Sequence, residues 1–224
     1  FEKGIGTGGY ILDKWEPGVR AFSKRNPNYW KEGRAHFDEI ETLSIVDTNA
    51  RTNALKTGQI DYMDRVELKT VHLMKKMPGV KVHSTTGTAH YTIPMLVDQK
   101  PYGNNDVRTA LKLAIDREAL VKQILRGYGS VGNDHPIAPV QQYHAKDLEQ
   151  RKYDPEKAKF HMKKAGMLDH VFNLHAADAA FAGAVDAAIL IKEHAKKAGI
   201  KINVVREPDD GYWSNVWIKK EWCM

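Results

Sequence analysis

Apolar and polar residues alternate with a period of two along the first part of the chain. Residues 10–15 and 19–23 alternate on either side of the turn Glu16-Pro17-Gly18, which predicts a β-hairpin. Residues 40–46 keep the same alternation and predict a third strand. Two further apolar runs predict extended segments, at 80–82 and 90–97. The first part of the chain is therefore expected to be mainly β-structure.

Helical periodicity becomes dominant after residue 100. Apolar residues recur every three to four positions, and the segments begin at Asn or Asp and end at Gly, as helices with caps do. Trp213 and Trp217 are four positions apart, so we expect both to pack into the core from one helical face. Residues 200–204 alternate as a strand, and another strand is expected around 222–223. The expected helices are 48–57, 66–77, 105–115, 116–125, 155–165 and 178–198.

This change of character near residues 90–100 predicts two domains. We place a partial β-rich lobe at residues 1–91 and a helix-rich α/β lobe at residues 92–224, and we expect a separate apolar core in each. The segment from Gly127 to Gln150 contains Gly and Pro but no periodic pattern. Its length is unusual for a structureless connection, which favours a functional loop.

Composition is that of an ordinary globular protein, with 224 residues of which 42% are hydrophobic and 28% charged. No apolar run reaches the roughly 18 residues of a membrane span. The net charge of +6 raises the possibility of a basic nucleic-acid-binding module. Because the Lys and Arg residues are scattered, solvated surfaces are the better interpretation, and nucleic acid is not the expected partner.

Candidate catalytic and metal-binding patterns are weak. Gly4, Gly6 and Gly9 have the spacing of the dinucleotide fingerprint, but a strand follows them where that fingerprint requires a helix, so a dinucleotide enzyme is a remote alternative. None of the ten histidines has the spacing of a zinc hydrolase, and Cys223 is the single cysteine. We therefore expect no enzyme activity, no metal site and no cofactor.

Several motifs in sequence order resemble the substrate-binding proteins of peptide-type ABC importers, that is, extracytoplasmic solute-binding protein family 5. Any one of these motifs alone would be weak, whereas their common order and spacing are specific. The motifs are Gly-Thr-Gly-Gly-Tyr at 6–10, Arg-Asn-Pro-Asn-Tyr-Trp at 25–30, Arg-Thr-Asn-Ala-Leu-Lys-Thr-Gly-Gln-Ile-Asp at 51–61, Val-Arg-Thr-Ala-Leu at 107–111, Ala-Ile-Asp-Arg at 114–117 and Tyr-Asp-Pro-Glu-Lys-Ala-Lys at 153–159.

The resemblance covers essentially the whole chain and implies an α/β fold of the class II periplasmic-binding-protein type. In that fold two lobes close over a solute, and this chain would be a central fragment holding part of the first lobe and most of the C-terminal lobe. The implied function is capture of a peptide-like solute and delivery to an ABC permease, by a protein that is monomeric when intact and periplasmic or extracellular. The same fold also carries nickel complexes, haem and sugars, so these remain alternatives.

The resemblance also implies candidate solute-binding residues. His90 and Tyr91 match the first hinge strand, and His135 stands in the loop that approaches the ligand. Trp222 and Cys223 match a Trp-Cys pair on a strand that lines the cleft. Because neighbouring side chains of a strand point to opposite faces, we expect Cys223 to line the cleft with Trp222 partly behind it. The carboxylate for the ligand's α-amino group would follow Met224.

Overall fold

The computed structural model describes residues 5–85 and 87–224, so Gly4 of the glycine pattern lies outside the described residues. The chain divides into two compact units, one ending at Val66 and the other beginning at Glu67. Residues 67–91 thus belong to the second unit. The lobe boundary at 91/92 stays a prediction, since a contact-based unit and a lobe of a two-lobed protein need not coincide.

The first unit holds a three-stranded antiparallel sheet in the order β1-β2-β3, as the alternation predicts. Its strands are β1 (Tyr10–Glu16), β2 (Arg20–Arg25) and β3 (Glu39–Leu43), followed by helix α1 (Thr48–Lys56). Asp47 caps α1 by accepting a 2.7 Å hydrogen bond from the amide of Ala50. Within residues 5–66 only Ala54 is buried, so the apolar core expected on this side is not formed there.

Packing explains the glycine-rich entry into β1. A side chain at Gly9 would come within 3.2 Å of the Tyr29 ring, which is closer than an ordinary van der Waals contact, so glycine lets the two segments pack without moving that ring. Asn26 donates from its side chain to the carbonyl of Gly8 and from its backbone to that of Gly9. The glycines therefore hold two chain segments together, and strand β1 follows them where a nucleotide site would need a helix.

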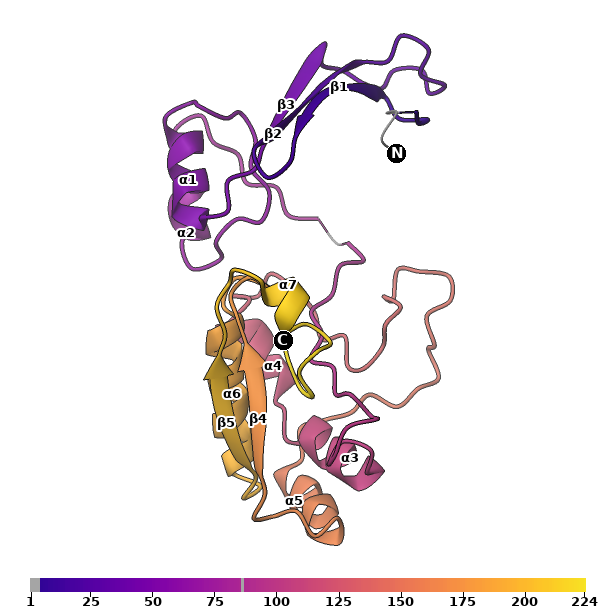
Figure 1. Cartoon of the computed structure of the whole chain (residues 1–224), viewed down its shortest axis with the longest axis vertical. Coiled ribbons are helices and arrows are strands. Elements are labelled where there is room, and N and C mark those ends of the chain that lie inside the picture. The colour runs from indigo at the N-terminus through magenta and orange to yellow at the C-terminus, as the bar shows by residue number, and fades with distance from the viewer. Residues whose placement is uncertain (1–4, 86) are drawn as a thin grey trace. The chain divides into compact units, whose positions relative to one another are not determined.

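The second unit is built around a β-α-β arrangement (Figure 1). Strands β4 (Val171–Ala176) and β5 (Lys201–Arg206) pair in parallel, and helix α6 (Ala184–Lys196) connects them and packs on them. The sequence predicts β5 but misses β4. Helix α6 also starts later than the predicted residue 178, because the Asp178 carboxylate accepts from the amides of Gly183 and Val185 and holds a turn before the helix.

The second unit also contains helices α2, α3, α4, α5 and α7. Helices α4 (Arg117–Gln123) and α5 (Pro155–Lys164) begin at the side-chain caps that the sequence predicts, Asp116 and Asp154, whereas α3 (Asn105–Leu113) is capped by Asn104, just before its predicted start. The predicted helix 66–77 is largely wrong, since only α2 (Val71–Met74) forms there; helix α7 (Tyr212–Asn215) is equally short. None of the helices in the described ranges 5–85 and 87–224 is long and apolar enough to cross a membrane.

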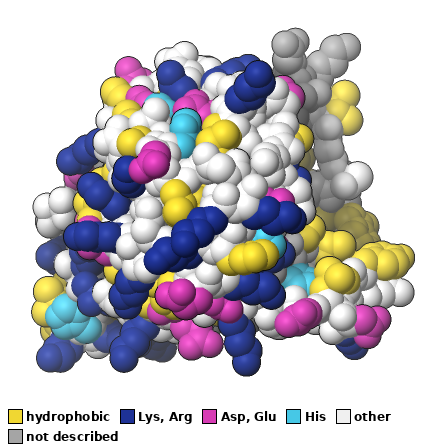
Figure 2. Space-filling model, turned by 90° about the horizontal axis from the view of Figure 1, so that it is seen from below, with side chains coloured by type: hydrophobic (Ala, Val, Ile, Leu, Met, Phe, Trp, Pro, Cys, Tyr) yellow, Lys and Arg dark blue, Asp and Glu magenta, His cyan; other side chains and the backbone are white. Residues whose placement is uncertain are grey.

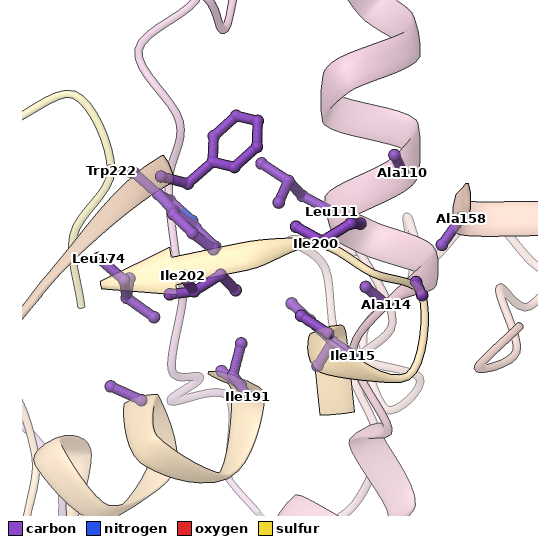
Figure 3. Close-up of a cluster of buried hydrophobic side chains, with 14 of the residues drawn as sticks. Ala110, Leu111, Ala114, Ile115, Ala158, Leu174, Ile191, Ile200, Ile202 and Trp222 are labelled. Carbon is purple, nitrogen blue, oxygen red and sulfur yellow. The ribbon is translucent and has the colours of Figure 1, made fainter. Parts of the chain in front are cut away.

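One apolar core dominates the second unit (Figure 3). Helices α3, α5 and α6, both strands and the C-terminal segment contribute to it, and Leu174, Ile191 and Trp222 are each at most 1% exposed. A smaller apolar cluster contains Ala177, Tyr212, Val216 and Cys223. The two clusters thus contain different side chains of the same C-terminal segment, Trp222 in the larger and Cys223 in the smaller.

Three further sequence predictions need correction. Residues 80–82 form no strand, and the run 90–97 forms a single bridge, Met95 to Trp222, because Pro94 has no amide hydrogen to extend a ladder. The strand expected at 222–223 is very short and consists of two bridges, Trp222 to Met95 and Cys223 to His175. Trp213 is 57% exposed and not in the core; α7 ends at Asn215, so no continuous helical face joins it to Trp217.

Candidate functional site

The C-terminal residues 221–224 run between β4 and residues 94–96. On one side, the amide of His175 donates to the carbonyl of Trp222 at 3.1 Å, and the amide of Met224 donates to the carbonyl of His175 at 2.9 Å. These two bonds extend the parallel sheet by one short strand next to β4.

On its other side, the same segment pairs with residues 94–96 in antiparallel fashion. The amide of Leu96 donates to the carbonyl of Glu221 at 2.9 Å, and that of Cys223 donates to Pro94 at 3.4 Å. The structure thus brings the segment that carries Trp222 and Cys223 next to the run that begins at His90 and Tyr91.

Side chains of this short strand alternate as the sequence predicts. Trp222 joins the main core, where its ring centroid lies 6.3 Å from that of Tyr102. Cys223 joins the smaller cluster and bridges His175, so these two side chains share the other face of the sheet. Both Trp222 and Cys223 are almost fully buried in this chain. Their contact with a solute stays a prediction.

Polar side chains gather on the face that Cys223 shares with His175. His175 is the next-to-last residue of β4, and its Nδ1 lies 2.6 Å from the Glu207 carboxylate just after β5. The hydroxyl of Tyr212 is buried and has no hydrogen-bond partner among the described residues. We call His175, Glu207, Tyr212 and Cys223 the carboxyl-edge cluster, since they lie where the parallel strands end, which is where open α/β sheets bind ligands.

Burial keeps two members of this cluster, Tyr212 and Cys223, in their uncharged forms. Burial, reinforced by the nearby Cys223 and Glu207, raises the pKa of the Tyr212 hydroxyl well above its ordinary value. Burial likewise raises the pKa of the Cys223 thiol, although a backbone hydrogen bond from Ile218 opposes this. At neutral pH the tyrosine and the cysteine are therefore protonated.

A chemical test follows from the burial of Cys223. The thiol is protonated and 0% exposed, so we expect iodoacetamide to label it far more slowly in the native protein than in urea-unfolded protein. Mass spectrometry of the alkylated protein over time measures both rates. Equal rates in the two states would show that the C-terminal segment is not held in the sheet.

The two predicted hinge residues are exposed. The ring of His90 lies 3.3 Å from the carbonyl of Thr88 through Nδ1. Tyr91 stacks on Phe181, with ring centroids 4.1 Å apart and planes at 16°, yet it is 58% exposed. Phe181 belongs to the turn between β4 and α6, so Tyr91 presents one aromatic face to solvent near the carboxyl ends of the strands.

The loop from Gly127 to Gln150 is anchored by one carboxylate. Asp134 lies 3.2 Å from Arg117, 2.9 Å from Arg151 and 3.8 Å from Lys112. Burial alone would raise the pKa of Asp134, but the hydrogen bond from Arg151 and the charges of Arg117 and Lys112 outweigh it, so this pKa lies below its ordinary value. The structure therefore ties the loop to α3, to α4 and to the segment before α5.

His135, the predicted site residue in this loop, contacts other loop residues. Its Nε2 lies 2.9 Å from the Gln150 amide nitrogen, and its ring centroid is 5.1 Å from that of His144. His144 in turn lies 2.7 Å from the carbonyl of Ile137 through Nδ1. His135 is not brought next to Trp222 or Cys223 by any contact found in the described residues. In residues 5–85 and 87–224 no group of three or more His, Cys, Asp or Glu side chains could hold a metal ion.

The sequence does not identify four residues near this site, namely His175, Glu207, Tyr212 and Phe181. His175 sits in the strand that was not predicted, and Glu207 meets it only through the pairing of β4 with β5. The alternation of Phe172, Leu174 and Ala176 was the available signal for β4.

Basic side chains do not form a continuous track on the face drawn in Figure 2. Lys and Arg are scattered there, with Asp and Glu between them. Many of the described cations also have acidic partners on the surface, as Lys24 has Asp13 and Lys201 has Asp169. This distribution favours a solvated surface, as the sequence predicts, and not a nucleic-acid interface.

Known sequences similar to this chain are bacterial solute-binding proteins. A family model described as "Bacterial extracellular solute-binding proteins, family 5 Middle" matches residues 1–224. The glutathione-binding protein GsiB of Escherichia coli K12 is 32% identical over 162 residues, which cover 72% of this chain and 31% of that protein. GsiB of Salmonella typhi is 31% identical over 165 residues, or 74% of this chain and 32% of that protein. The matches thus span about a third of these relatives.

Solved structures show the same fold. The periplasmic binding protein DppA of Helicobacter pylori, in complex with the peptide STSA, has a TM-score of 0.79 at 22% identity and covers 97% of this chain and 42% of its own. NikZ of Campylobacter jejuni, in complex with Ni(L-His), has a TM-score of 0.81 at 22% identity, covering 97% and 45%. AppA of Bacillus subtilis, in complex with a nonapeptide, has a TM-score of 0.75 at 23% identity, covering 96% and 46%. The predicted α/β binding-protein fold is thereby confirmed.

Proposed function

Because the chain belongs to family 5 of the bacterial extracellular solute-binding proteins, we propose that it is part of a protein that captures a peptide-like solute and delivers it to an ABC permease. The protein works outside the cytoplasm, has no catalytic activity and needs no cofactor. The solute lies between the two lobes, beside the hinge run at His90 and Tyr91 and the strand that carries Trp222 and Cys223. The loop with His135 approaches it. The intact protein is a monomer.

One observation carries this proposal, namely the pairing of residues 94–96 with residues 221–224. It sets two segments far apart in sequence side by side, next to the carboxyl ends of parallel strands. Just before this pairing, the backbone of residues 90–93 makes no hydrogen bond to other backbone groups of the described chain. Unpaired extended backbone can accept an extended peptide as an added strand, which gives affinity without strict side-chain specificity.

The candidate functions differ in which solute the protein binds. The GsiB relatives are named for glutathione, DppA and AppA were solved with peptides, and NikZ with a nickel–histidine complex. Glutathione and short peptides share an extended amide backbone, which suits the unpaired residues 90–93. A nickel complex, haem or a sugar on the same fold is the second candidate, and the similarity to NikZ favours the nickel complex among these three.

Isothermal titration calorimetry on the full-length protein tests the proposal directly. Glutathione, a tetrapeptide mixture, Ni(L-His)₂ and a disaccharide would each be titrated under the same buffer conditions. Binding of glutathione or the peptides, with no heat from the other two, supports the proposal. Binding of the nickel complex or the disaccharide alone would replace the peptide-like solute by that class.

Replacing Tyr91 with alanine should weaken binding of that peptide solute about tenfold, because the exposed aromatic face is lost while the fold is retained. Calorimetry measures the change in Kd, and a circular dichroism melt checks the fold. Tyr62→Ala is the matched control, since Tyr62 is 80% exposed in the first unit and has no aromatic partner in the described chain. Unchanged affinity in Tyr91→Ala would remove this residue from the site.

A further inference from the structure

Two histidines of the loop between α4 and α5 lie next to each other. The ring centroids of His135 and His144 are 5.1 Å apart, and the ring planes meet at 39°, so the rings are not stacked face to face. Both side chains are partly buried. Pro136 and Pro139 lie between them in sequence and restrict the backbone of this stretch. The loop therefore holds two imidazole rings close together.

The distance between these rings is that of two imidazoles on one metal ion. A ligating nitrogen lies about 2.1 Å from a Zn²⁺ ion, and tetrahedral geometry then places two imidazole centroids about 5.2 Å apart. The observed separation of 5.1 Å agrees with this value. The loop thus already sets the two rings at the distance that a shared ion requires.

His144 makes the hydrogen bond that is typical of a ligating histidine. Its Nδ1 lies 2.7 Å from the carbonyl oxygen of Ile137, and since a carbonyl can only accept, Nδ1 carries the proton. In the neutral ring, Nε2 then keeps its lone pair. Metal-ligating histidines commonly donate their other N–H group to such a carbonyl, which fixes the ring and leaves the opposite nitrogen for the ion.

Gln150 can hold His135 in the same way. Its side-chain amide lies 2.9 Å from Nε2 of His135 and is bonded at 3.0 Å to the amide of the buried Asn133. An amide that turns over exchanges its NH₂ group and its oxygen. With the Gln150 oxygen toward the ring, Nε2–H of His135 donates to it and Nδ1 is left for the ion. The Asn133 oxygen, which has no partner in the described chain, then accepts from Gln150.

The ligand atoms determine the class of ion. Neutral imidazoles bind Zn²⁺, Cu²⁺ and Ni²⁺, whereas Mg²⁺ and Ca²⁺ prefer oxygen ligands. Asp134 is next to His135, but its carboxylate pairs with Arg117 and Arg151, so we do not count it as a ligand. The chain offers two ligands here, which agrees with the finding that residues 5–85 and 87–224 hold no larger group of ligating side chains. Water or a small chelating molecule completes the coordination.

We propose that His135 and His144 form a binding site for a divalent transition-metal ion. His144 binds the ion through Nε2 and His135 binds it through Nδ1, while Gln150 positions the His135 ring. Cu²⁺ binds more tightly than Ni²⁺ or Zn²⁺, following the general order of affinities for nitrogen ligands. Both ligands come from one loop, so the site does not depend on which solute the protein captures. The bound ion closes the stretch from 135 to 144 and stiffens the loop.

Calorimetric titration of ZnCl₂ into the full chain, in a buffer that does not bind metal, tests this site. We expect saturable binding of Zn²⁺ and no heat from MgCl₂. His135→Ala and His144→Ala should each weaken Zn²⁺ binding by at least about tenfold, and Gln150→Ala should weaken it by about tenfold. Electron paramagnetic resonance of bound Cu²⁺ should show coupling to two imidazole nitrogens in the unmodified protein and to one in His144→Ala.

His36→Ala is the matched control, since His36 is an exposed histidine of the first unit. It should bind Zn²⁺ as the unmodified protein does, and circular dichroism checks that every variant is folded. Equal weakening in His36→Ala and His144→Ala would show adventitious binding to scattered histidines and overturn the proposal. An unchanged affinity in either His135→Ala or His144→Ala would also overturn it, because a site with two protein ligands depends on both.

Discussion

Replacing Trp222 with alanine should lower the unfolding free energy by about 3–5 kcal/mol. The indole is 1% exposed and packs with Tyr102 and the other residues of the main core (Figure 3), so its removal leaves a cavity that the surrounding side chains fill only in part. It also anchors the short strand between β4 and residues 94–96. Urea unfolding followed by far-ultraviolet circular dichroism measures the loss.

Trp213→Ala is the matched control for this prediction. Trp213 is 57% exposed and contacts Tyr212 and Trp217 edge-on, so its removal should change stability by less than about 1 kcal/mol. If both variants lost the same stability, Trp222 would not be a core residue. A Trp222→Ala variant as stable as the unmodified protein would contradict the packing of the C-terminal segment.

The family motifs in this sequence indicate the fold because their polar side chains make hydrogen bonds that hold particular turns of it. Arg51 donates from Nη1 to the carbonyl of Ile45 at 2.7 Å, and Arg108 donates in the same way to Tyr102 at 2.6 Å. Asn26 secures the glycine-rich entry into β1. These are local contacts, within a few residues or across one hairpin, so a single sequence reveals them. They say nothing about the solute, which is why family and fold follow from the sequence while solute identity does not.

Capping residues explain the helices that were predicted correctly. Asp47, Asp116 and Asp154 each accept a hydrogen bond from a backbone amide of the first helical turn, and that chemistry is readable from sequence. The strand predicted for residues 90–97 is wrong for the opposite reason, because its pairing does not depend on local residues. Residues 90–97 are apolar enough for a strand, but only Met95 finds a bridging partner, and that partner lies more than a hundred residues away at Trp222.

The carboxyl-edge cluster was unpredictable for a related reason. His175 and Glu207 are 32 positions apart, and they meet because β4 and β5 pair in parallel with α6 between them. Alternation can place each residue on a face of its own strand, but the register of the pairing comes from tertiary packing. The assignment of Trp222 and Cys223 to the site therefore depends on the resemblance to the family motif and not on alternation.

Substitution of Asp134 by asparagine should lower the unfolding free energy by about 2–3 kcal/mol. Arg117 is 16% exposed, and the variant leaves its guanidinium without a carboxylate; Arg151 and Lys112 lose the same partner. Breaking a buried ion pair typically costs about 3–5 kcal/mol, and we expect a smaller loss because Asp134 itself keeps 30% of its side chain exposed. Chemical unfolding at pH 7 measures the loss.

The pH dependence of this loss follows from the lowered pKa of Asp134. A carboxylate with a lower pKa in the folded state stabilises the protein above its unfolded pKa of about 3.9, and that stabilisation disappears as the pH falls through the folded pKa. The difference between the unmodified protein and Asp134→Asn should therefore be constant from pH 7 to about pH 5 and shrink below about pH 4. Asp147→Asn, in the same loop but without an ion pair in the described chain, should change stability little at any pH. A difference that persisted unchanged at pH 2 would show that the asparagine acts through packing and not through charge.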